Sequence, residues 1–400
     1  MKLSVSILAA ALAAVFTTAS GVAAAQQKEI RIAHIYGKTG ALEAYAKQTQ
    51  AGLQLGLEYA TGGKMEVLGR KIVILEKDDQ LKPDIAKSAL ATAFGDDKVD
   101  LAIGPTSSAS ALAMLPVAEE YKKVLLVEPA VADSITGDKW NRYVFRTGRS
   151  SSQDAIAAAV ATPQNAQIAM LAQDYAFGRD GVKALKEALY AIDSKAKIVH
   201  EEYVPQATTD FTAPAQRMFD ALKDKPGRKI IGIIWAGPNP VTKIADLKPE
   251  RFGIELAPGG NILPVMKTWK ALAGVEGAIY YYYGFPKNKT NDWLVAEYKK
   301  RYGGTPPDFF VAGGMAAGIA VVEAIKKAGG TDTEKLIAAM EGLTFDSPKG
   351  AMTFRKEDHQ ALQAMYHFRI KKEQKDEWDL LELVREIPAK EIPLPVRNRK

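Results

Sequence analysis

A strand, a glycine turn and the start of a helix follow one another in Val99-Asp100-Leu101-Ala102-Ile103-Gly104-Pro105-Thr106-Ser107-Ser108-Ala109-Ser110. The apolar run 99–103 predicts a buried strand, and residues 106–121 predict the helix after it. In open α/β sheets, ligands bind outside the carboxyl ends of the strands, where this polar turn stands. Its hydroxyls and free N–H groups suit a carboxylate, because the start of a helix favours an anion. Plain helix capping is the competing explanation of the same serines.

The same alternation of strand and helix extends in both directions from this stretch. In a first block we expect strands at 30–35, 71–75, 99–103 and 124–127 and helices at 42–59, 83–94 and 106–121. In a second block we expect strands at 167–171, 197–203 and 229–235 and helices at 151–160, 181–190 and 211–222. Such alternation predicts parallel sheets covered by helices on both faces. Two successive blocks of this size predict two α/β lobes.

The last third of the chain is less regular. An aromatic-rich strand is expected at 277–283, and helices are expected at 291–302, 310–327 and 333–340. Thr353-Phe354 and residues 366–370 resemble a late hairpin. The tail 386–400 contains prolines and scattered charges, and we expect it to form a strap or to be disordered.

The N-terminus and the composition indicate an exported protein. Residues 1–25 form a secretory signal, in which Ala23-Ala24-Ala25 supplies small residues for cleavage before Gln26. The chain has no cysteine, which excludes disulfides, thiol nucleophiles and a lipid anchor after the signal. A free exported protein needs a second membrane to retain it, so we expect a periplasmic location. The net charge of +6 is spread over many basic and acidic residues, which argues against a nucleic-acid partner.

Motifs for catalysis or for a cofactor are missing. Gly37-Lys38-Thr39 lacks the earlier glycine of a phosphate loop, because Ile32 occupies that position. The four histidines, at 34, 200, 359 and 367, are scattered without metal-pair spacing. We therefore expect a binding protein that is not an enzyme and has neither a metal ion nor a cofactor.

Several motifs, in their order and spacing, resemble the leucine/isoleucine/valine-binding family of periplasmic solute receptors, which serve ABC transporters. They are found at 32–45, 52–63, 77–79, 104–108, 129–134 and 173–178. The resemblance implies a type I periplasmic binding protein fold, with two Rossmann-like lobes joined by three crossover strands. It implies a first lobe from 28–148 plus 280–350 and a second lobe from 149–279 plus 351–385. The ligand then lies between the lobes, which close over it.

The resemblance also implies the ligand-binding residues. Tyr45 stands where the family places an aromatic ring, and Thr106, Ser107 and Ser108 form the carboxylate-binding turn. The remaining positions are Ala130 and Ala132, which offer backbone groups, and Phe177 and Trp235, which close from the second lobe. Tyr280-Tyr281-Tyr282-Tyr283 lies near a crossing, and strand alternation puts Tyr281 and Tyr283 on one face and Tyr280 and Tyr282 on the other. One pair is expected in the cleft, and the sequence leaves open which pair that is.

Gly259 departs from the family pattern, because amino-acid-binding members carry an acid there for the ammonium of the ligand. Losing one partner of a buried ion pair costs about 3–5 kcal/mol, and Glu128, Asp133 and Asp174 are the acids that could substitute. The departure favours a small carboxylate without an α-ammonium, with an aromatic acid as the first choice and a branched-chain or other amino acid as the alternative. The expected partners are an inner-membrane ABC permease and its ATPase subunits, and a monomer is expected. A ligand-sensing module that docks on a receptor is the alternative of another class.

Overall fold

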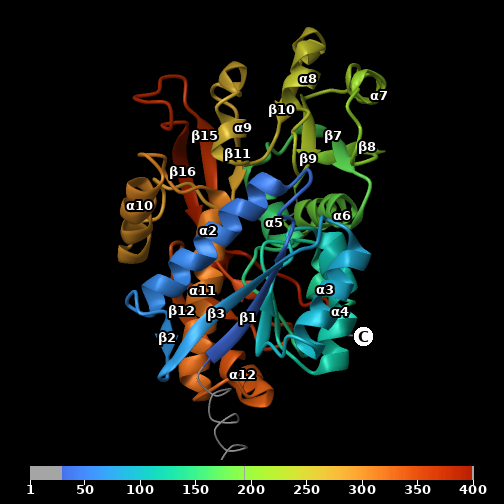
Figure 1. Cartoon of the computed structure of the whole chain (residues 1–400). Coiled ribbons are helices and arrows are strands. Elements are labelled where there is room, and N and C mark those ends of the chain that lie inside the picture. Colours follow the sequence, from blue (N-terminus) through green and yellow to red (C-terminus); the bar gives the residue numbers. More distant parts are fainter. Residues whose placement is uncertain (1–28, 193, 399–400) are drawn as a thin grey trace, which may run out of the picture.

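The computed structural model describes residues 29–192 and 194–398. The predicted signal peptide, residues 1–25, lies outside the described residues. Two α/β lobes are stacked one above the other, with strands β1–β6 in the lower lobe and β7–β10 in the upper one (Figure 1). The two-lobed α/β fold predicted from the sequence is confirmed.

The lower lobe is built on a six-stranded sheet in the order β2-β3-β1-β4-β5-β6. The strands β1, β3, β4, β5 and β6 are parallel, and the short β2 forms a hairpin with β3. The strands are β1 (Glu29–Tyr36), β2 (Glu66–Val67), β3 (Arg70–Asp78), β4 (Leu101–Ile103), β5 (Leu125–Val127) and β6 (Val144–Arg146). The helices around them are α2 (Glu43–Ala60), α3 (Pro83–Gly95), α4 (Ser108–Tyr121), α11 (Phe309–Ala328) and α12 (Thr333–Met340).

Helices α2 and α11 touch backbone to backbone in the lower lobe. A Cβ added at Gly52 would lie 2.1 Å from the Val311 carbonyl oxygen, and one at Gly314 would lie 2.1 Å from that of Thr49. Only glycine permits this approach, because any larger side chain overlaps the facing helix. Helix α11 is also apolar and long enough to span a bilayer, which the sequence analysis did not anticipate. Its most apolar window is 89% buried inside the protein, as expected of a core helix.

The upper lobe contains a four-stranded parallel sheet in the order β10-β9-β7-β8. Its strands are β7 (Ala166–Gln173), β8 (Lys197–Val204), β9 (Arg228–Ile234) and β10 (Ile254–Ala257). A separate antiparallel sheet has the order β11-β15-β16 and consists of β11 (Glu276–Ile279), β15 (Met365–Ile370) and β16 (Leu381–Ile387). The helices are α5 (Ser151–Ala161), α6 (Ala176–Ala191), α7 (Thr212–Leu222), α8 (Val241–Asp246) and α9 (Leu263–Met266). Helix α10 (Lys289–Arg301) contacts the lower lobe, where Arg301 pairs with Glu58.

Two predictions about the last third of the chain are wrong. The expected hairpin does not form, because β13 (Gly350–Phe354) pairs with β12 (Thr344–Ser347) and β14 (Ala361–Leu362), whereas β15 pairs with β11 and β16. This pairing also ties residues 350–362 to the lower lobe, whereas the expected boundary was at 350. A parallel bridge between Arg146 and Gln360 holds the small sheet against β6. The pairing of β15 with the distant β11 and the bridge between Gln360 and the distant Arg146 decide the two points, and local patterns reveal neither contact.

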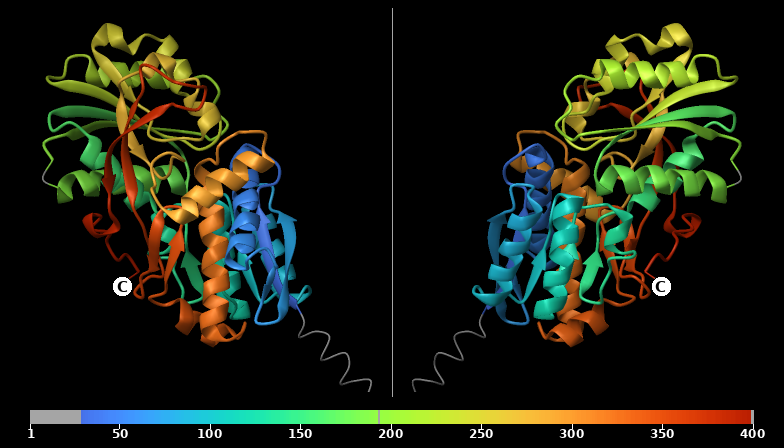
Figure 2. Two further views of the ribbon diagram at one scale, coloured as in Figure 1. Left: turned by 90° about the vertical axis from the view of Figure 1, so that its left-hand side faces the viewer. Right: turned by 90° about the vertical axis from the view of Figure 1, so that its right-hand side faces the viewer.

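The C-terminal tail forms a strap that returns to the lower lobe (Figure 2). Ile392 and Leu394 are buried, and the Leu394 carbonyl accepts a hydrogen bond from Arg355. Arg397 then pairs with Asp133 of the 3-10 turn η1 (Asp133–Ile135) and with Glu187 of α6. Of the two alternatives left open for the tail, the described residues up to 398 form the strap.

Candidate functional site

The polar turn after β4 is held by contacts within the lower lobe. Gly104 has a φ of +124°, and a Cβ there would lie 1.9 Å from the Ile35 carbonyl oxygen. A side chain is therefore excluded, and the turn passes directly over β1. The Thr106 hydroxyl accepts a hydrogen bond from the Gly37 N–H, and the Ser108 hydroxyl accepts from the N–H groups of Val131 and Ala132. Both hydroxyl oxygens act as acceptors, and within the described part of the chain neither hydroxyl donates a hydrogen bond, so both protons can bind a ligand.

Polar contacts bridge the two lobes above this turn, so the structure is a closed form. The Tyr45 hydroxyl on α2 donates to the Asn261 side-chain oxygen at 3.3 Å and accepts from the Gly237 N–H at 3.0 Å. At the other end of the lobe contact, the Ser134 N–H and hydroxyl donate to Asp180 on α6. These bonds join residues more than 40 positions apart in the sequence, and they stabilise the closed arrangement of the two lobes.

A cavity of about 60 Å³ lies between the lobes in this closed form. Its lining comprises Leu42, Tyr45, Thr106, Ser108, Pro129, Val131, Arg149, Tyr175, Phe177, Trp235, Ala236, Gly260, Asn261, Ile262, Phe309 and Phe310. We call this space the cleft cavity. Six of the lining side chains are aromatic. Among the described residues that line it, Arg149 alone is charged, and no carboxylate takes part.

Arg149 enters the cleft cavity from the segment between β6 and α5. Its Nε donates to both carboxylate oxygens of Asp154, each at 2.8 Å. The guanidinium lies 4.7 Å from the ring centre of Phe309 and 5.4 Å from that of Tyr280. Its two terminal amino groups have no hydrogen-bond partner in the described part of the chain. Because a guanidinium forms paired bonds with a carboxylate, Arg149 can receive an anionic ligand without leaving Asp154.

Five of the predicted site residues line the cleft cavity: Tyr45, Thr106, Ser108, Phe177 and Trp235. Ser107 is buried and starts helix α4. Ala130 and Ala132 lie behind the lining, and the N–H of Ala132 is already bound by Ser108. Their neighbour Val131 lines the cavity instead. Gly259 lines a second, larger space in the upper lobe.

The strand expected over 277–283 is too long, because β11 ends at Ile279. The alternation argument for Tyr281 and Tyr283 therefore fails. The Tyr281 hydroxyl donates to Asn291, and that of Tyr283 donates to the Trp378 carbonyl oxygen. Neither lines the cleft cavity. Tyr280 instead contacts the Arg149 guanidinium from outside the cleft cavity. A run of four tyrosines in the sequence does not indicate which of them makes this contact.

The acids considered as ammonium partners are all engaged outside the cleft cavity. Burial raises the pKa of Glu128 to about 7, and its carboxylate accepts a hydrogen bond from the Thr147 hydroxyl. Asp133 binds Ser152, and Asp174 pairs with Arg179. Asp308 lies nearer, but it accepts from the N–H groups of Leu263 and Phe309, and burial raises its pKa to about 6. The described residues thus offer no free carboxylate to an ammonium in the cleft.

The sequence analysis missed Arg149, Tyr175 and the pair Phe309-Phe310. Arg149 immediately precedes the capping box of α5, in which Ser150 and Gln153 bond reciprocally, so its backbone position is fixed. Phe309 and Phe310 open helix α11 after its cap Asp308. A cation before one helix start and an aromatic pair at another were visible signals. Only the fold shows that both face the same cavity.

The fold and the closed cleft define a two-lobed solute-binding protein, and the comparisons agree. A profile of the family described as periplasmic binding protein matches residues 29–375. The chain therefore belongs to the periplasmic binding protein family, and the resemblance inferred from the sequence is confirmed.

Individual relatives narrow the type. A solved structure of an ABC-type branched-chain amino acid transporter from Rhodopseudomonas palustris CGA009 is 63% identical, with 93% of this chain and 100% of that chain covered and a TM-score of 0.82. A solute binding protein of an ABC transporter from R. palustris BisB5, in complex with 3,4-dihydroxybenzoic acid, is 28% identical, with 90% and 98% covered and a TM-score of 0.79. A Leu/Ile/Val-binding protein homolog 6 from Brucella abortus (strain 2308) is 26% identical over 270 residues, which cover 64% of this chain and 66% of that relative. This chain is a substrate-binding protein of the ABC-transporter type.

Proposed function

We propose that this protein binds an aromatic carboxylate without an α-ammonium and delivers it, in the periplasm, to an ABC permease and its ATPase subunits. The observation that carries the proposal is the charge of the cleft cavity, to whose lining the described residues contribute Arg149 and no carboxylate. A bound amino acid would leave its ammonium unpaired in a buried site, at a cost of several kcal/mol. A simple carboxylate carries no such penalty.

The aromatic lining supports a flat ligand. Tyr45, Phe177, Trp235 and Phe310 present ring faces or edges from both lobes, and aromatic pairs contribute about 0.5–1.5 kcal/mol each beyond the area that they bury. The relative from R. palustris BisB5 was solved with an aromatic acid of this kind. The protein acts by lobe closure as a monomer and performs no chemistry on its ligand.

The carboxylate is bound from both lobes in this proposal. The free protons of Thr106 and Ser108 donate from the lower lobe, and the terminal amino groups of Arg149 donate from the segment that joins the lobes. Closure brings Phe177 and Trp235 over the ring and excludes water, which strengthens the ionic contact. The Tyr45 bridge to Asn261 and Gly237 joins the two lobes, so a ligand that favours closure and this bridge stabilise the same state.

A branched-chain amino acid is the second candidate, because the 63% identical relative is described as a branched-chain amino acid transporter. A thermal-shift screen distinguishes the two. We expect benzoate and ring-hydroxylated benzoates to raise the melting temperature, since a ligand at 100 times its Kd stabilises the fold by about 2.7 kcal/mol. Leucine and valine at the same concentrations should leave it unchanged. Stabilisation by leucine or valine, with none by the aromatic acids, would overturn the proposal.

A further inference from the structure

A second cavity, of about 840 Å³, lies inside the upper lobe. We call it the rear cavity. Arg149, Phe177, Trp235, Gly260 and Phe309 line both this space and the cleft cavity. These five residues form the boundary that the two spaces share, and Arg149 is the charged member of that boundary. The closed cleft cavity alone is small, since benzene already fills a cavity of about 150 Å³ in another protein.

The rear cavity lies where the turn after β10 contacts β11, because the two strands belong to different sheets. The Gly260 N–H donates to the Ala278 carbonyl at 2.8 Å, and a Cβ on Gly260 would lie 2.4 Å from the Ile279 side chain. Beyond this point β10 stays with β9, while β11 pairs with β15. The wedge between the two sheets is roofed by α5, which packs on β11 and β15, and by α6, which packs on β7.

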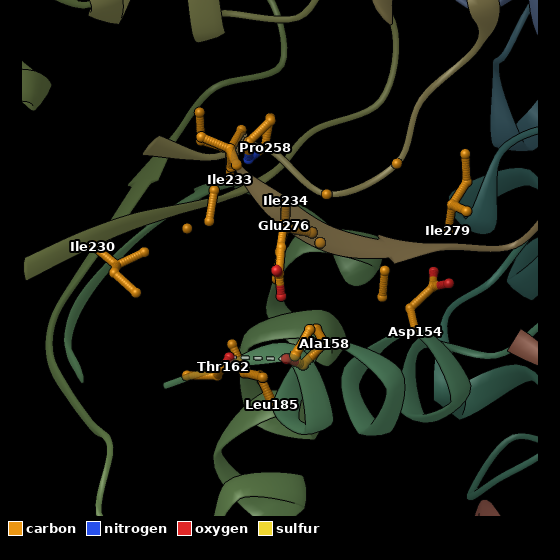
Figure 3. Close-up of a pocket in the computed structure, with 18 of the residues that line it drawn as sticks. Asp154, Ala158, Thr162, Leu185, Ile230, Ile233, Ile234, Pro258, Glu276 and Ile279 are labelled. Carbon is orange, nitrogen blue, oxygen red and sulfur yellow. Dashed lines mark hydrogen bonds between the residues drawn. The ribbon is translucent and has the colours of Figure 1, made fainter. Parts of the chain in front are cut away.

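The walls of the rear cavity expose slightly more apolar than polar area. Ile168, Met170, Leu185, Ile230, Ile234 and Ile279 supply much of the lining. Figure 3 shows Ala158 of α5 and Thr162, which follows the end of that helix, on one side, facing Glu276 and Ile234 across the space. At the outer end Arg228 pairs with Glu255 and Glu276 pairs with Arg369, whereas Lys372 has no ion-pair partner among the described residues. The aliphatic side chains named above therefore define the part of the cavity that suits an uncharged ligand group.

We propose that the rear cavity is a subsite for an apolar tail, so that the transported solute is an aromatic acid with an extended alkyl or aryl substituent opposite its carboxylate. This inference rests on the proposed function, because it places the carboxylate at Arg149. The ring then lies beside Arg149, partly in each of the two spaces, and the substituent extends along Phe177 and Trp235 into the upper lobe. Volumes of 300–1,000 Å³ are usual for small-molecule sites, and the rear cavity falls in that range.

The test is a calorimetric titration of the full protein with 4-alkylbenzoates from benzoate to 4-octylbenzoate. Each buried methylene contributes about 0.8 kcal/mol, or about fourfold in affinity. We expect affinity to rise by about that factor for each added methylene until the rear cavity is full. Equal affinity across the series would overturn the subsite and leave the aromatic-acid proposal standing. Failure of benzoate and of every longer acid to bind would contradict the proposed function itself.

Two variants of helix α5 locate the tail. Ala158 and Ala161 both line the rear cavity, and the helical rise puts Ala161 about 4.5 Å further from the cleft. Ala158→Phe should end the gain in affinity at a short alkyl chain, and Ala161→Phe should end it a few methylenes later. Both should bind benzoate as the unmodified protein does, which also shows that they fold. Ala191→Phe adds the same ring at the exposed end of α6 and should leave the series unchanged. If the phenylalanine variants follow the same series as the control, the tail does not lie in the rear cavity.

Discussion

Replacing Arg149 with methionine should weaken the binding of an aromatic carboxylate by about 100-fold or more. Truncating one partner of a buried, hydrogen-bonded charge pair costs about 2–5 kcal/mol, and each 1.4 kcal/mol is tenfold in Kd. The Arg149 side chain is only 12% exposed, so water cannot replace its contact with the ligand. Arg149→Lys keeps the charge but cannot form the paired hydrogen bonds. Its affinity for the ligand should lie between that of the unmodified protein and that of Arg149→Met. Calorimetric titration with benzoate measures all three affinities.

The Arg149 variant needs a control, because it also leaves the half-buried Asp154 without its partner. Burial raises the pKa of Asp154 even with Arg149 present, and an unpaired carboxylate there would repel an anionic ligand. The double variant Arg149→Met with Asp154→Asn removes that repulsion. We expect it to bind benzoate as poorly as the single variant. Recovery to within about threefold of the unmodified protein would show that Arg149 only neutralises Asp154 and does not bind the ligand.

Replacing His34 with leucine should remove much of the acid sensitivity of the fold. His34 lies on β1 and is fully buried, and neither ring nitrogen has a hydrogen-bond partner among the described residues. Burial lowers its pKa from 6.5 to about 3. Below pH 6.5 the unfolded chain therefore takes up a proton that the folded protein excludes. The contribution of His34 to the free energy of unfolding is therefore fully present above pH 6.5. It falls by about 1.4 kcal/mol for each pH unit down to about pH 3.

Urea unfolding at pH 7.5 and pH 4.5 measures this contribution. The difference in unfolding free energy between the two pH values should be smaller in His34→Leu by about 2–3 kcal/mol. Leucine has a similar volume and stays apolar, so the stability at pH 7.5 should change little. Other titrating groups are common to both proteins and cancel in the comparison. An equal loss of stability in both proteins would mean that His34 is protonated in the folded state.

The fold could be predicted from the sequence because its strands and helices follow local rules. Parallel strands buried on both faces gave apolar runs such as 101–103 and 125–127, and Pro83 marked the first turn of α3. The late elements escaped prediction because β13 and β15 belong to different sheets. No local pattern distinguishes a strand that pairs with its neighbour from one that pairs with a segment 90 residues away.

The candidate site was predictable only in part, for a similar reason. Turns that follow strands carry a recognisable glycine and hydroxyl pattern, so Thr106 and Ser108 were found. Arg149 follows β6 in a turn, residues 147–152, that carries the same glycine and hydroxyl pattern, and the sequence analysis overlooked it. Phe309 begins helix α11 without such a pattern, and only the fold brings it to the cleft. The absence of an acid at Gly259 indicated a ligand without an ammonium. The closed cleft adds Arg149, a cation that can bind the carboxylate of such a ligand.

A matched pair of ligands tests the central claim most directly. 3-Phenylpropanoate and phenylalanine differ only in the α-ammonium, so a calorimetric titration with each isolates that group. A cleft lined by Arg149 and without a carboxylate should bind 3-phenylpropanoate and should bind phenylalanine at least about 100-fold more weakly, since an unpaired buried charge costs about 3–5 kcal/mol. Equal or tighter binding of phenylalanine would contradict the account, because an acid would then have to meet the ammonium in the cleft.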